Sequence, residues 1–436
     1  MKIAIIGSGI SGLSCAWKLS QQQPTWEVTL FEANKTLGGH ATTVDVHLDG
    51  RDYALETAFT VYNPQASPHF SALLDQLGIE GQAVENSFSL HNPDTKLEFH
   101  SGKPFVQRGN MLKPAYWRFL GEIKRFNALC KARLQQPEKS EATLSTLLRK
   151  NGFSAYFALH YILPRAATIW SLSMEDMGKF PLPVFLRLFD QHGLFDDAPK
   201  SQAKIIAGGS REYIRRLEQL LPANVTLLTH TPVVSVTRAA NAVTVSSARG
   251  NEVFDQVIFA CHADQALSLL DTPTDSEKQV LGSLPYKTND VVLHTDIHQL
   301  PPNRLAWASW NYRLPNGVGN ALGQTPSAPV HRAIVRERPV SVTYNLNILQ
   351  GIASPKTFCL SLNPLKPVDE NKILLRTTHR HPVLNLSSLQ SQRQRDLING
   401  HNRSWFCGAY WHNGLHEDGV ISANEVVNKL LAHDSA

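Results

Sequence analysis

The stretch IAIIGSGISGLSCAWKL, residues 3–19, decides the fold at the very start of the chain. Its first residues predict a short buried strand that runs directly into a turn at Gly7. Gly7, Gly9 and Gly12 then follow with GxGxxG spacing, and an apolar helix face extends from Gly12 to about residue 21. In a βαβ unit these glycines give a tight turn, a close approach of the backbone to a pyrophosphate, and close packing of helix on strand. The N–H groups at the helix start, around Ser11, are then free to face phosphates.

Two further features follow at the spacing that a dinucleotide site requires. The segment WEVTLFEA predicts a second strand that ends in Glu32, twenty residues after Gly12, where a carboxylate can accept hydrogen bonds from adenosine ribose hydroxyls. The next segment, NKTLGGHATT, brings the pair Gly38 and Gly39 close to a second part of the dinucleotide. A plain NAD site does not need this second glycine pair, and an α/β domain with an incidental glycine turn needs neither feature.

Composition narrows the class of protein. The chain has 436 residues, 42% of them hydrophobic and 18% charged, which is typical of a folded enzyme of two or three domains. A net charge of +5 is too small for a nucleic-acid surface, so no nucleic-acid partner is expected. Five cysteines without a CxxC pair favour a reducing compartment and argue against a disulfide framework, and no metal site is expected. With neither a membrane-length apolar run nor a signal-peptide cleavage region, the sequence predicts a cytoplasmic protein.

The combination of Glu32 with the Gly38–Gly39 pair resembles the flavin-containing amine oxidoreductase superfamily, which includes monoamine and polyamine oxidases and phytoene desaturases. The resemblance implies an α/β fold, in which a Rossmann-like FAD-binding domain of the GR2 type carries an inserted α+β substrate domain. The expected FAD-binding domain comprises residues 1–65, 200–285 and 395–436, and the substrate domain 66–199 and 286–394. The superfamily's cysteine motif for covalent flavin attachment is absent, so the expected cofactor is non-covalent FAD.

The same resemblance implies a set of cofactor-binding residues spread over the whole chain. Val233 would contact the adenine through its backbone, Glu417 would bond a ribityl hydroxyl, and a helix starting near Gly419 would stabilise negative charge on the reduced flavin. Residues 50–63, which include Thr57, would lie against the flavin ring, and an ordinary β turn is the alternative there. For the C-terminal helix, the alternative is a simple capped helix without a cofactor. The full set is Gly7, Gly9, Ser11, Gly12, Glu32, Ala33, Gly38, Gly39, His40, Thr57, Val233, Cys261, Gly408, Glu417, Asp418, Gly419 and Val420.

The resemblance also implies catalytic and substrate residues. Lys287 falls where many amine oxidases place a lysine near flavin N5, with an exposed strand-end lysine as the alternative, and Tyr410 is a second catalytic candidate. Tyr62, Trp411 and Leu415 are the substrate candidates. Amine oxidases set an aromatic residue where this chain has Leu415, and an apolar, non-aromatic side chain there suits a hydrocarbon better than an amine. A shift of one residue in this loop would bring Gly414 or His416 to that position. His262 is interpreted as structural.

Seven short motifs narrow the resemblance to one bacterial branch of amine-oxidase-like proteins: GGHATTV, TVYN, GGSREY, ACHADQAL, SVTYNLN, HPV and CGAYWHNGLHEDG. Members of that branch are associated with cyclopropane-type methyltransferases and modified fatty acids, which implies a lipid acyl chain or another apolar molecule as substrate. The expected reaction removes a hydride from an sp³ carbon to flavin N5. The alternatives are an amine oxidase, and a non-catalytic flavin- or lipid-binding accessory protein of a partner methyltransferase.

Residues 107–150 carry ten basic and three acidic residues around an apolar stripe. A basic amphipathic segment of this kind predicts peripheral contact with the anionic inner membrane, and a solvated helix face is the alternative. The aromatic-rich residues 151–200 are interpreted mainly as core, with an apolar channel as the second interpretation, and residues 313–340 as a loop or lid.

Overall fold

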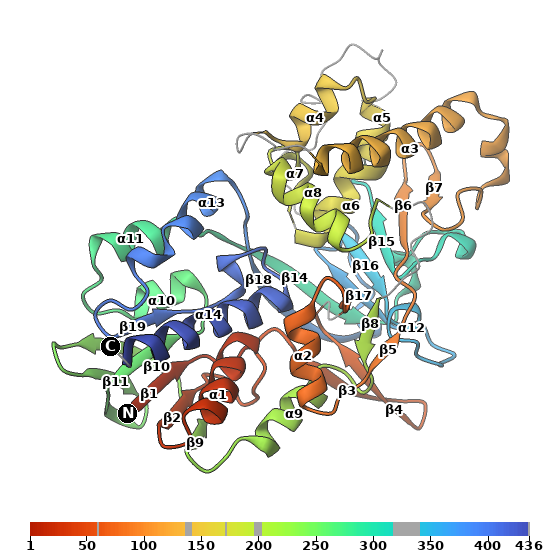
Figure 1. The fold of residues 1–436 in the computed structure, drawn as a ribbon. Helices are drawn as coiled ribbons and strands as arrows, with labels where there is room; N and C mark the ends of the chain where they lie inside the picture. The colour runs from red at the N-terminus through yellow and green to blue at the C-terminus, as the bar shows by residue number, and fades with distance from the viewer. Residues whose placement is uncertain (59–60, 136–141, 171, 196–202, 317–340, 435–436) are drawn as a thin grey trace. The chain divides into compact units, whose positions relative to one another are not determined.

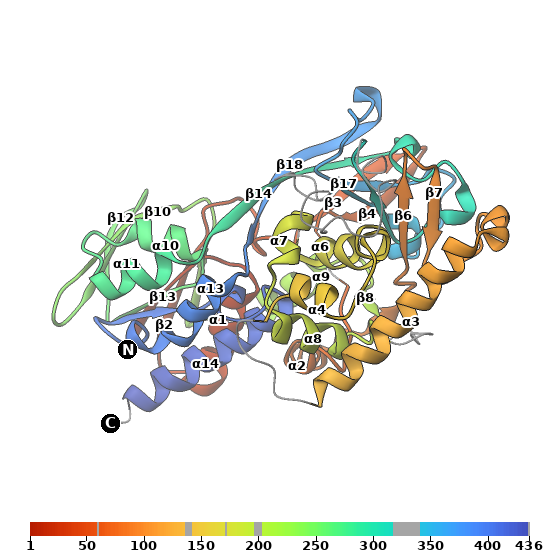
Figure 2. The same cartoon turned by 90° about the horizontal axis from the view of Figure 1, so that it is seen from above.

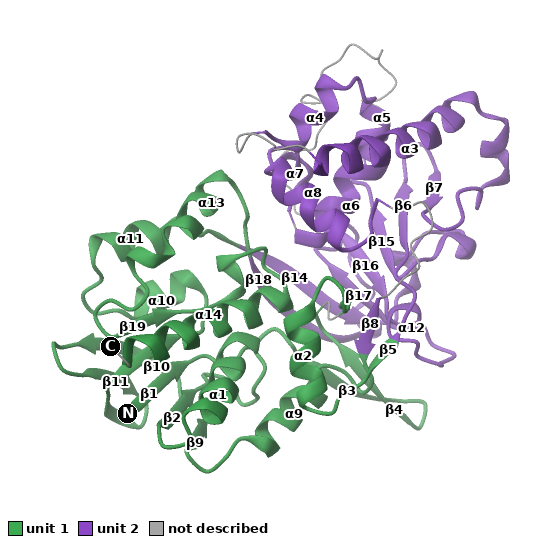
Figure 3. Cartoon of the chain, viewed as in Figure 1, with its two compact units in different colours: residues 1–82, 206–286, 382–436 green, residues 83–205, 287–381 purple. Residues whose placement is uncertain are grey.

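The computed structural model describes residues 1–58, 61–135, 142–170, 172–195, 203–316 and 341–434. The chain forms two compact units (Figure 3), of which unit 1 contains Met1–Gln82, Ile206–Tyr286 and Pro382–Ala436, and unit 2 contains Ala83–Ile205 and Lys287–His381. Unit 1 is larger than the FAD-binding domain expected from the sequence, because it also contains residues 66–82 and 382–394. Residues 203–205, expected in that domain, fall in unit 2.

Unit 1 is built on a five-stranded parallel sheet (Figure 1). Ile5 at its centre pairs with Leu30 on one side and with Ile258 on the other, and none of the three is exposed. A parallel sheet is covered on both faces, which explains why its strands read as continuous apolar runs. In the order β19-β13-β1-β2-β9 the strands are Ser404–Phe406, Gln256–Phe259, Lys2–Ile6, Glu27–Phe31 and Val225–Leu228.

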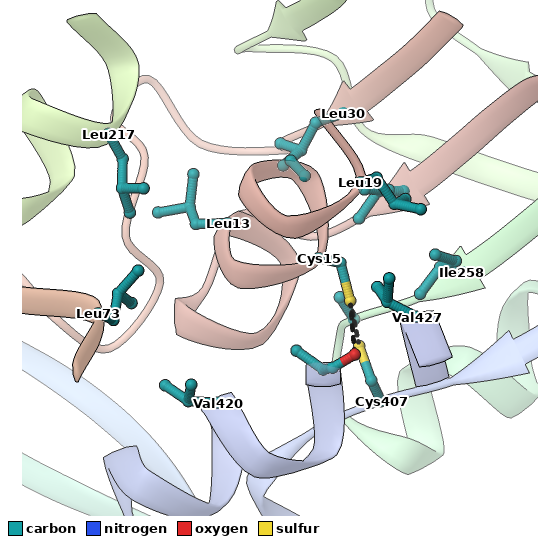
Figure 4. Close-up of a cluster of buried hydrophobic side chains, with 14 of the residues drawn as sticks. Leu13, Cys15, Leu19, Leu30, Leu73, Leu217, Ile258, Cys407, Val420 and Val427 are labelled. Atoms are coloured by element: carbon teal, nitrogen blue, oxygen red, sulfur yellow. Dashed lines mark hydrogen bonds between the residues drawn. The ribbon is translucent and has the colours of Figure 1, made fainter. Parts of the chain in front are cut away.

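The first face of this sheet packs against α1 (Ile10–Gln22) and α14 (His416–Asp434), which also pack against each other. Figure 4 shows the core between them, in which side chains from α1, α14, β2 and β13 meet. Cys15 of α1 lies in this core, 3.7 Å from the Cys407 sulfur. The two ends of the chain therefore share one hydrophobic core.

The second face is formed by the alternate residues of the same strands. Phe259 and Phe406 stack here with ring centroids 5.1 Å apart, in a core shared with a three-stranded antiparallel sheet and two helices. The sheet is β10 (Val233–Arg238), β11 (Val243–Ser247) and β12 (Gly250–Phe254), and the helices are α10 (Ala263–Leu269) and α11 (Asp275–Gly282). Unit 1 also contains β3 (Thr43–Leu48), β4 (Arg51–Glu56), α2 (Pro68–Gln76), α9 (Arg211–Leu220), α13 (Leu386–Arg393), η8 (Arg395–Leu397) and η9 (Ala409–Trp411).

Unit 2 is built on a seven-stranded mixed sheet, in which β15 pairs with β6 in parallel and with β16 in antiparallel orientation. In sheet order the strands are β18 (Ile373–Pro382), β14 (Tyr286–His294), β17 (Cys359–Leu362), β16 (Val342–Asn345), β15 (Trp310–Arg313), β6 (Phe88–Asn92) and β7 (Leu97–His100). A short pair, β5 (Gly81–Ala83) and β8 (Lys204–Ile206), lies where the chain passes between the units.

Helices make up the other half of unit 2, and Figure 2 shows the longest of them, α3, running beside α8. Phe126, Phe157 and Phe185 are fully buried among them, with Phe126 and Phe157 ring centroids 5.3 Å apart, so these aromatic side chains form core. The helical elements are η1 (Arg108–Leu112), α3 (Pro114–Leu134), α4 (Leu144–Lys150), α5 (Ala155–Phe157), the π-helical turn η2 (Ala158–Ile162), α6 (Leu163–Trp170), α7 (Met174–Gly178), α8 (Leu182–Gln191), η3 (Ile297–Gln299), η4 (Arg304–Ala306), α12 (Leu346–Leu349) and η7 (Glu370–Lys372).

The predicted fold class is confirmed: a Rossmann-like unit is interrupted by an α+β unit. One boundary was wrong, since the last helix begins at His416 and not near Gly419. Most of the loop expected at 313–340 lies outside the described residues. In the part of the chain that the structure describes, every helix is too short or too polar to cross a membrane.

Candidate functional site

The turn after β1 has the geometry that its glycines predict. Gly7 has φ +105°, and a Cβ there would lie 2.9 Å from the Ala260 oxygen, while a Cβ on Gly12 would overlap the Gly7 oxygen. Both positions therefore require glycine to hold strand, turn and helix together. Gly9 is different, because a Cβ there would meet no atom within 4 Å. The space beside Gly9 is the cradle that a closely approaching pyrophosphate would fill.

The second glycine pair lies directly against the first loop. The Gly38 N–H donates to the Ser8 oxygen at 3.0 Å, and Gly9 and Gly38 form a parallel bridge. Gly39 has φ +61°, and a Cβ on it would lie 3.1 Å from the Gly9 Cα atom. Two loops separated by thirty residues of sequence thus form one glycine-lined backbone surface, on which a phosphate can approach without meeting side chains.

Glu32 follows β2 and is 6% exposed. Its Oε2 accepts the Ser8 N–H at 3.0 Å and the Ser8 hydroxyl at 2.6 Å, and its Oε1 accepts the Asn34 N–H at 2.8 Å. A carboxylate offers about four acceptor positions, so Glu32 retains capacity for a ribose hydroxyl on Oε1. Ala33, the neighbour in the predicted set, is exposed beside it.

Two helix starts meet at this loop. A Cβ on Gly419 of α14 would lie 2.7 Å from the Ile10 Cγ2 atom and 2.9 Å from the Ser11 hydroxyl oxygen, so the glycine lets α14 approach the first turn of α1. The N-cap residue of α1, Gly9, has no side chain to cap the helix. Because each helix start carries partial positive charge, the two together favour an anionic ligand.

The early start of α14 changes which of its N–H groups are available. The Gly419 N–H donates to the Leu415 oxygen at 3.2 Å, so Gly419 and Val420 lie within the hydrogen-bonded part of the helix. The N–H groups without an acceptor in the helix are those of His416, Glu417 and Asp418. The Asp418 carboxylate accepts the Leu415 N–H at 2.8 Å, and burial raises its pKa to about 6.

Glu417 occupies a position that the sequence did not predict. Its Oε1 accepts the His69 N–H at 2.9 Å and its Oε2 accepts the Phe70 N–H at 2.7 Å. Both donors are in the first turn of α2, whose own N-cap residue, Ser67, makes no capping bond with its side chain. The carboxylate expected on a ribityl hydroxyl therefore caps a helix in this structure.

Three aromatic rings stack at the same end of unit 1. The His40 and His262 ring centroids are 5.3 Å apart, and those of His262 and Tyr286 are 4.5 Å apart, with interplanar angles of 21° and 18°. Burial and the charge of His40 lower the pKa of His416 to about 4, so this imidazole is neutral at pH 7. Only His40 was in the predicted set. His262 and His416 could have been found from the sequence, because each lies in a later cofactor motif, in ACH and in GLH.

The remaining predicted cofactor residues have the following surroundings. Thr57 donates its N–H and its hydroxyl to the Thr42 oxygen, at 3.0 and 2.9 Å. Val233 begins β10 and pairs with Ser247. Burial raises the pKa of the Cys261 thiol to about 12. Gly408 lies against the Tyr410 ring, and a Cβ on Gly408 would overlap that ring.

Most predicted catalytic and substrate residues of unit 1 are core residues. Tyr410 and Trp411 are 3% and 2% exposed, and the Trp411 indole N–H donates to the Phe406 oxygen at 2.8 Å. Tyr62 is 7% exposed and packs edge-on against Phe70. Leu415, just before α14, is partly buried.

Lys287 belongs to unit 2 and not to the unit that carries these loops. It lies in β14, with its Nζ 3.8 Å from Asp176 Oδ2 of α7. Within the described residues, no group of three or more His, Cys, Asp or Glu side chains could hold a metal ion.

Residues 10–311 match the family described as flavin containing amine oxidoreductase. The chain belongs to the flavin-containing amine oxidoreductase family. This match confirms the resemblance inferred from the two glycine loops and Glu32, and it makes the protein a flavin-containing oxidoreductase.

Known structures share the fold at low identity. A CLA-producing fatty acid isomerase from P. acnes has a TM-score of 0.69 at 13% identity, covering 98% of both chains. Cyclohexylamine oxidase from Brevibacterium oxydans IH-35A has a TM-score of 0.65 at 12% identity, covering 100% of this chain and 99% of that one. Coproporphyrinogen III oxidase from Staphylococcus aureus (strain NCTC 8325 / PS 47) is 57% identical over 37 residues, which are only 8% of this chain and 8% of that protein.

Proposed function

We propose that this protein is an FAD-dependent oxidoreductase that oxidises an sp³ carbon of a lipid acyl chain. The observation that carries the cofactor assignment is the buried Glu32 carboxylate beside the two glycine loops. A carboxylate at the end of the second strand serves a ribose of an adenosine half, which FAD has and FMN lacks. The glycine surface around Gly9 and Gly39 and the convergent starts of α1 and α14 suit the pyrophosphate between the two halves.

The cofactor is proposed to bind without a covalent bond. Cys15, Cys130, Cys359 and Cys407 are buried, and Cys261 is the partly exposed cysteine. A thiolate is the nucleophile that a covalent link through cysteine would need. Although the residue as a whole is partly exposed, desolvation of the Cys261 thiol raises its pKa to about 12, so the thiol is protonated at pH 7. Heat denaturation should therefore release all of the flavin into solution.

Bound FAD would supply a two-electron acceptor for a hydride from one carbon of the substrate, and the proton lost from the neighbouring carbon would pass to water as the C=C bond forms. The N–H groups of His416, Glu417 and Asp418 would face the ring edge on which negative charge develops, and the neutral His416 imidazole would add no positive charge there. Glu32 would orient the adenosine half, and Gly9 would admit the pyrophosphate.

An acyl chain is favoured over an amine by two observations. Leu415 is the residue before α14, where an aromatic side chain would serve an amine. The adjacent aromatics Tyr410 and Trp411 are packed into the core of unit 1, and the Trp411 N–H is bonded to the Phe406 oxygen.

Anaerobic reduction of the bound flavin tests this proposal. The holoenzyme is mixed in separate cuvettes with bacterial phospholipid, free fatty acids, and a panel of polyamines and aryl amines, and the flavin absorbance is followed. Bleaching by a lipid alone supports the proposal. Bleaching by amines alone would assign the protein to the amine oxidases and overturn it. A flavin that no addition reduces would favour the accessory role beside a methyltransferase, which pull-down of that partner would establish.

A further inference from the structure

Unit 2 exposes a group of large apolar side chains at one end. Leu112 is 88% exposed, Leu305 65%, Trp117 52% and Met111 50%. These are all of the large hydrophobic side chains that unit 2 exposes among its described residues; the others exposed in the chain belong to unit 1. Exposed apolar side chains that gather at one place mark an interaction surface more often than scattered ones do. We call these four residues the apolar cluster.

Hydrogen bonds tie together the elements that carry the cluster. The Trp117 indole N–H donates to the Met111 oxygen at 2.8 Å, which ties α3 to the preceding turn η1, and the Trp117 ring packs on Phe105 with centroids 5.2 Å apart. Asn303 Nδ2, next to η4, donates to the Val106 oxygen at 3.2 Å, just before η1. In Figures 1 and 2, η4 (teal) and the start of α3 (orange) lie at the same end of unit 2, beyond β7.

The surroundings of the cluster are strongly basic. Residues 103–135 contain eight Lys or Arg side chains and a single acid, Glu122. Glu122 is turned inward, because its carboxylate accepts the Ser154 N–H at 2.7 Å and the Ser154 hydroxyl at 2.6 Å. Exposed basic residues flank the cluster and continue along the outer face of α3: Lys103, Arg108, Lys113, Arg118, Lys124, Arg125, Lys131 and Arg304.

We infer that this surface docks on an anionic phospholipid bilayer. The four apolar side chains would enter the interfacial region, where Trp in particular is favoured, and the basic side chains would meet lipid phosphates. Each basic side chain near such a surface strengthens binding about fivefold at physiological ionic strength. A second copy of the chain would bring the same positive charge to the contact, which disfavours self-association. This inference concerns the surface of unit 2 and does not depend on the proposed substrate.

Vesicle binding by the flavin-loaded full chain tests the inference. Co-sedimentation is measured with vesicles of phosphatidylcholine alone and of phosphatidylcholine mixed with phosphatidylglycerol, at low and high salt. We expect binding to the anionic vesicles that weakens as salt rises. No binding to anionic vesicles at low salt, or equal binding to both lipid compositions, would overturn the inference.

Matched variants locate the contact. Leu112→Ser combined with Leu305→Ser should weaken binding at least about tenfold, because each leucine loses a buried apolar surface. Leu386→Ser combined with Leu397→Ser removes two exposed leucines of unit 1 and should leave binding unchanged. Arg118→Glu with Lys124→Glu should also weaken binding about tenfold or more, whereas Arg249→Glu in unit 1 should not. Equal losses in the unit 1 controls would contradict the assignment.

A second readout is independent of how much protein sediments. Brominated lipid chains should quench part of the tryptophan fluorescence of the native protein, and Trp117→Phe should remove that quenched part. Quenching that persists in Trp117→Phe would contradict insertion of the cluster. If sedimentation velocity showed self-association abolished by Leu112→Ser, the surface would be an interface between copies and the membrane assignment would fall. Neither measurement involves turnover, so their outcome is separate from that of flavin reduction.

Discussion

The Glu417 carboxylate accepts the backbone N–H groups of His69 and Phe70 and thereby caps α2 from the first turn of α14. Phe70 and Glu417 are 347 residues apart in the sequence. The same glutamate lies in the turn whose N–H groups would face the flavin. A change at Glu417 is therefore expected to act on stability first and on the cofactor second.

Replacing Glu417 with glutamine should destabilise the protein by about 1–2 kcal/mol, because the new amide N–H₂ would face one of the two backbone N–H donors. Denaturant unfolding of the apoprotein measures the change. Glu27→Gln serves as the control. The Glu27 side chain is largely exposed, and its ion pair with Lys2 Nζ, at 3.8 Å, contributes little to stability. An unchanged unfolding free energy with weaker flavin binding would instead indicate that Glu417 contacts the cofactor directly.

The glycines of the first loop should separate folding from cofactor binding. Gly9→Ala adds a methyl group in open space, so it should cost less than about 1 kcal/mol of stability while lowering FAD affinity about 10- to 100-fold. Gly12→Ala should destabilise the fold by about 3 kcal/mol or more, because its methyl group overlaps the Gly7 backbone. Thermal unfolding without cofactor and fluorescence titration with FAD measure the two effects. Full FAD affinity in Gly9→Ala would show that no pyrophosphate lies beside Gly9.

Glu32→Gln tests the adenosine half of the site. Loss of the charged acceptor should weaken FAD binding about 10- to 100-fold, since a hydrogen bond to a charged group contributes about 1.5–3 kcal/mol. FMN, which has no adenosine, should bind native protein and variant equally. Glu27→Gln, at the opposite end of β2, is again the matched control. A parallel loss of FMN and FAD affinity would mean that Glu32 supports the loop through Ser8 and not through the ribose.

Asp418 should make stability depend on pH. Its pKa in the folded protein is about 6, above the ordinary value of 3.8, so the folded state binds the proton more tightly than the unfolded state. Its contribution is therefore most favourable below about pH 4 and is lost as pH rises to about 6, by roughly 2–3 kcal/mol. Asp418→Asn should flatten this part of the profile of unfolding free energy against pH, and Asp190→Asn, at an exposed position of α8, is the control variant. An unchanged profile in Asp418→Asn would exclude this titration.

Features set by neighbouring residues could be predicted from the sequence, whereas features set by distant contacts could not. The Gly7–Gly12 turn, Glu32 and the Gly38–Gly39 pair lie within forty residues of sequence, and in the structure Glu32 and Gly38 both bond Ser8 of the first loop. The start of α14 was misplaced because a glycine was taken as the helix start, whereas the Asp418 carboxylate already holds the Leu415 N–H one turn earlier. The capping of α2 by Glu417 joins segments from the two ends of the chain, so no local pattern could indicate it.

The burial of single side chains and the boundaries of the two units also depend on contacts between distant segments. Trp411 was predicted as a substrate residue, but its indole shares a buried core with Phe406 and its N–H donates to the Phe406 oxygen. Residues 66–82 were expected in the substrate domain, yet α2 belongs to unit 1 through Phe70 and Leu74, which share the core of α1. An amphipathic pattern predicts that a helix has a buried face, but it does not indicate which element packs against that face.

The most direct measurement of the central claim is a single anaerobic turnover with mass analysis of the lipid. Holoenzyme in excess over a defined phospholipid is incubated without oxygen, the reduced flavin is quantified from its absorbance, and the acyl chains are released and weighed by mass spectrometry. The account predicts one acyl chain lighter by two hydrogen atoms for each flavin reduced. Reduced flavin with unaltered acyl chains, or reduction by an amine with release of its imine, would contradict it.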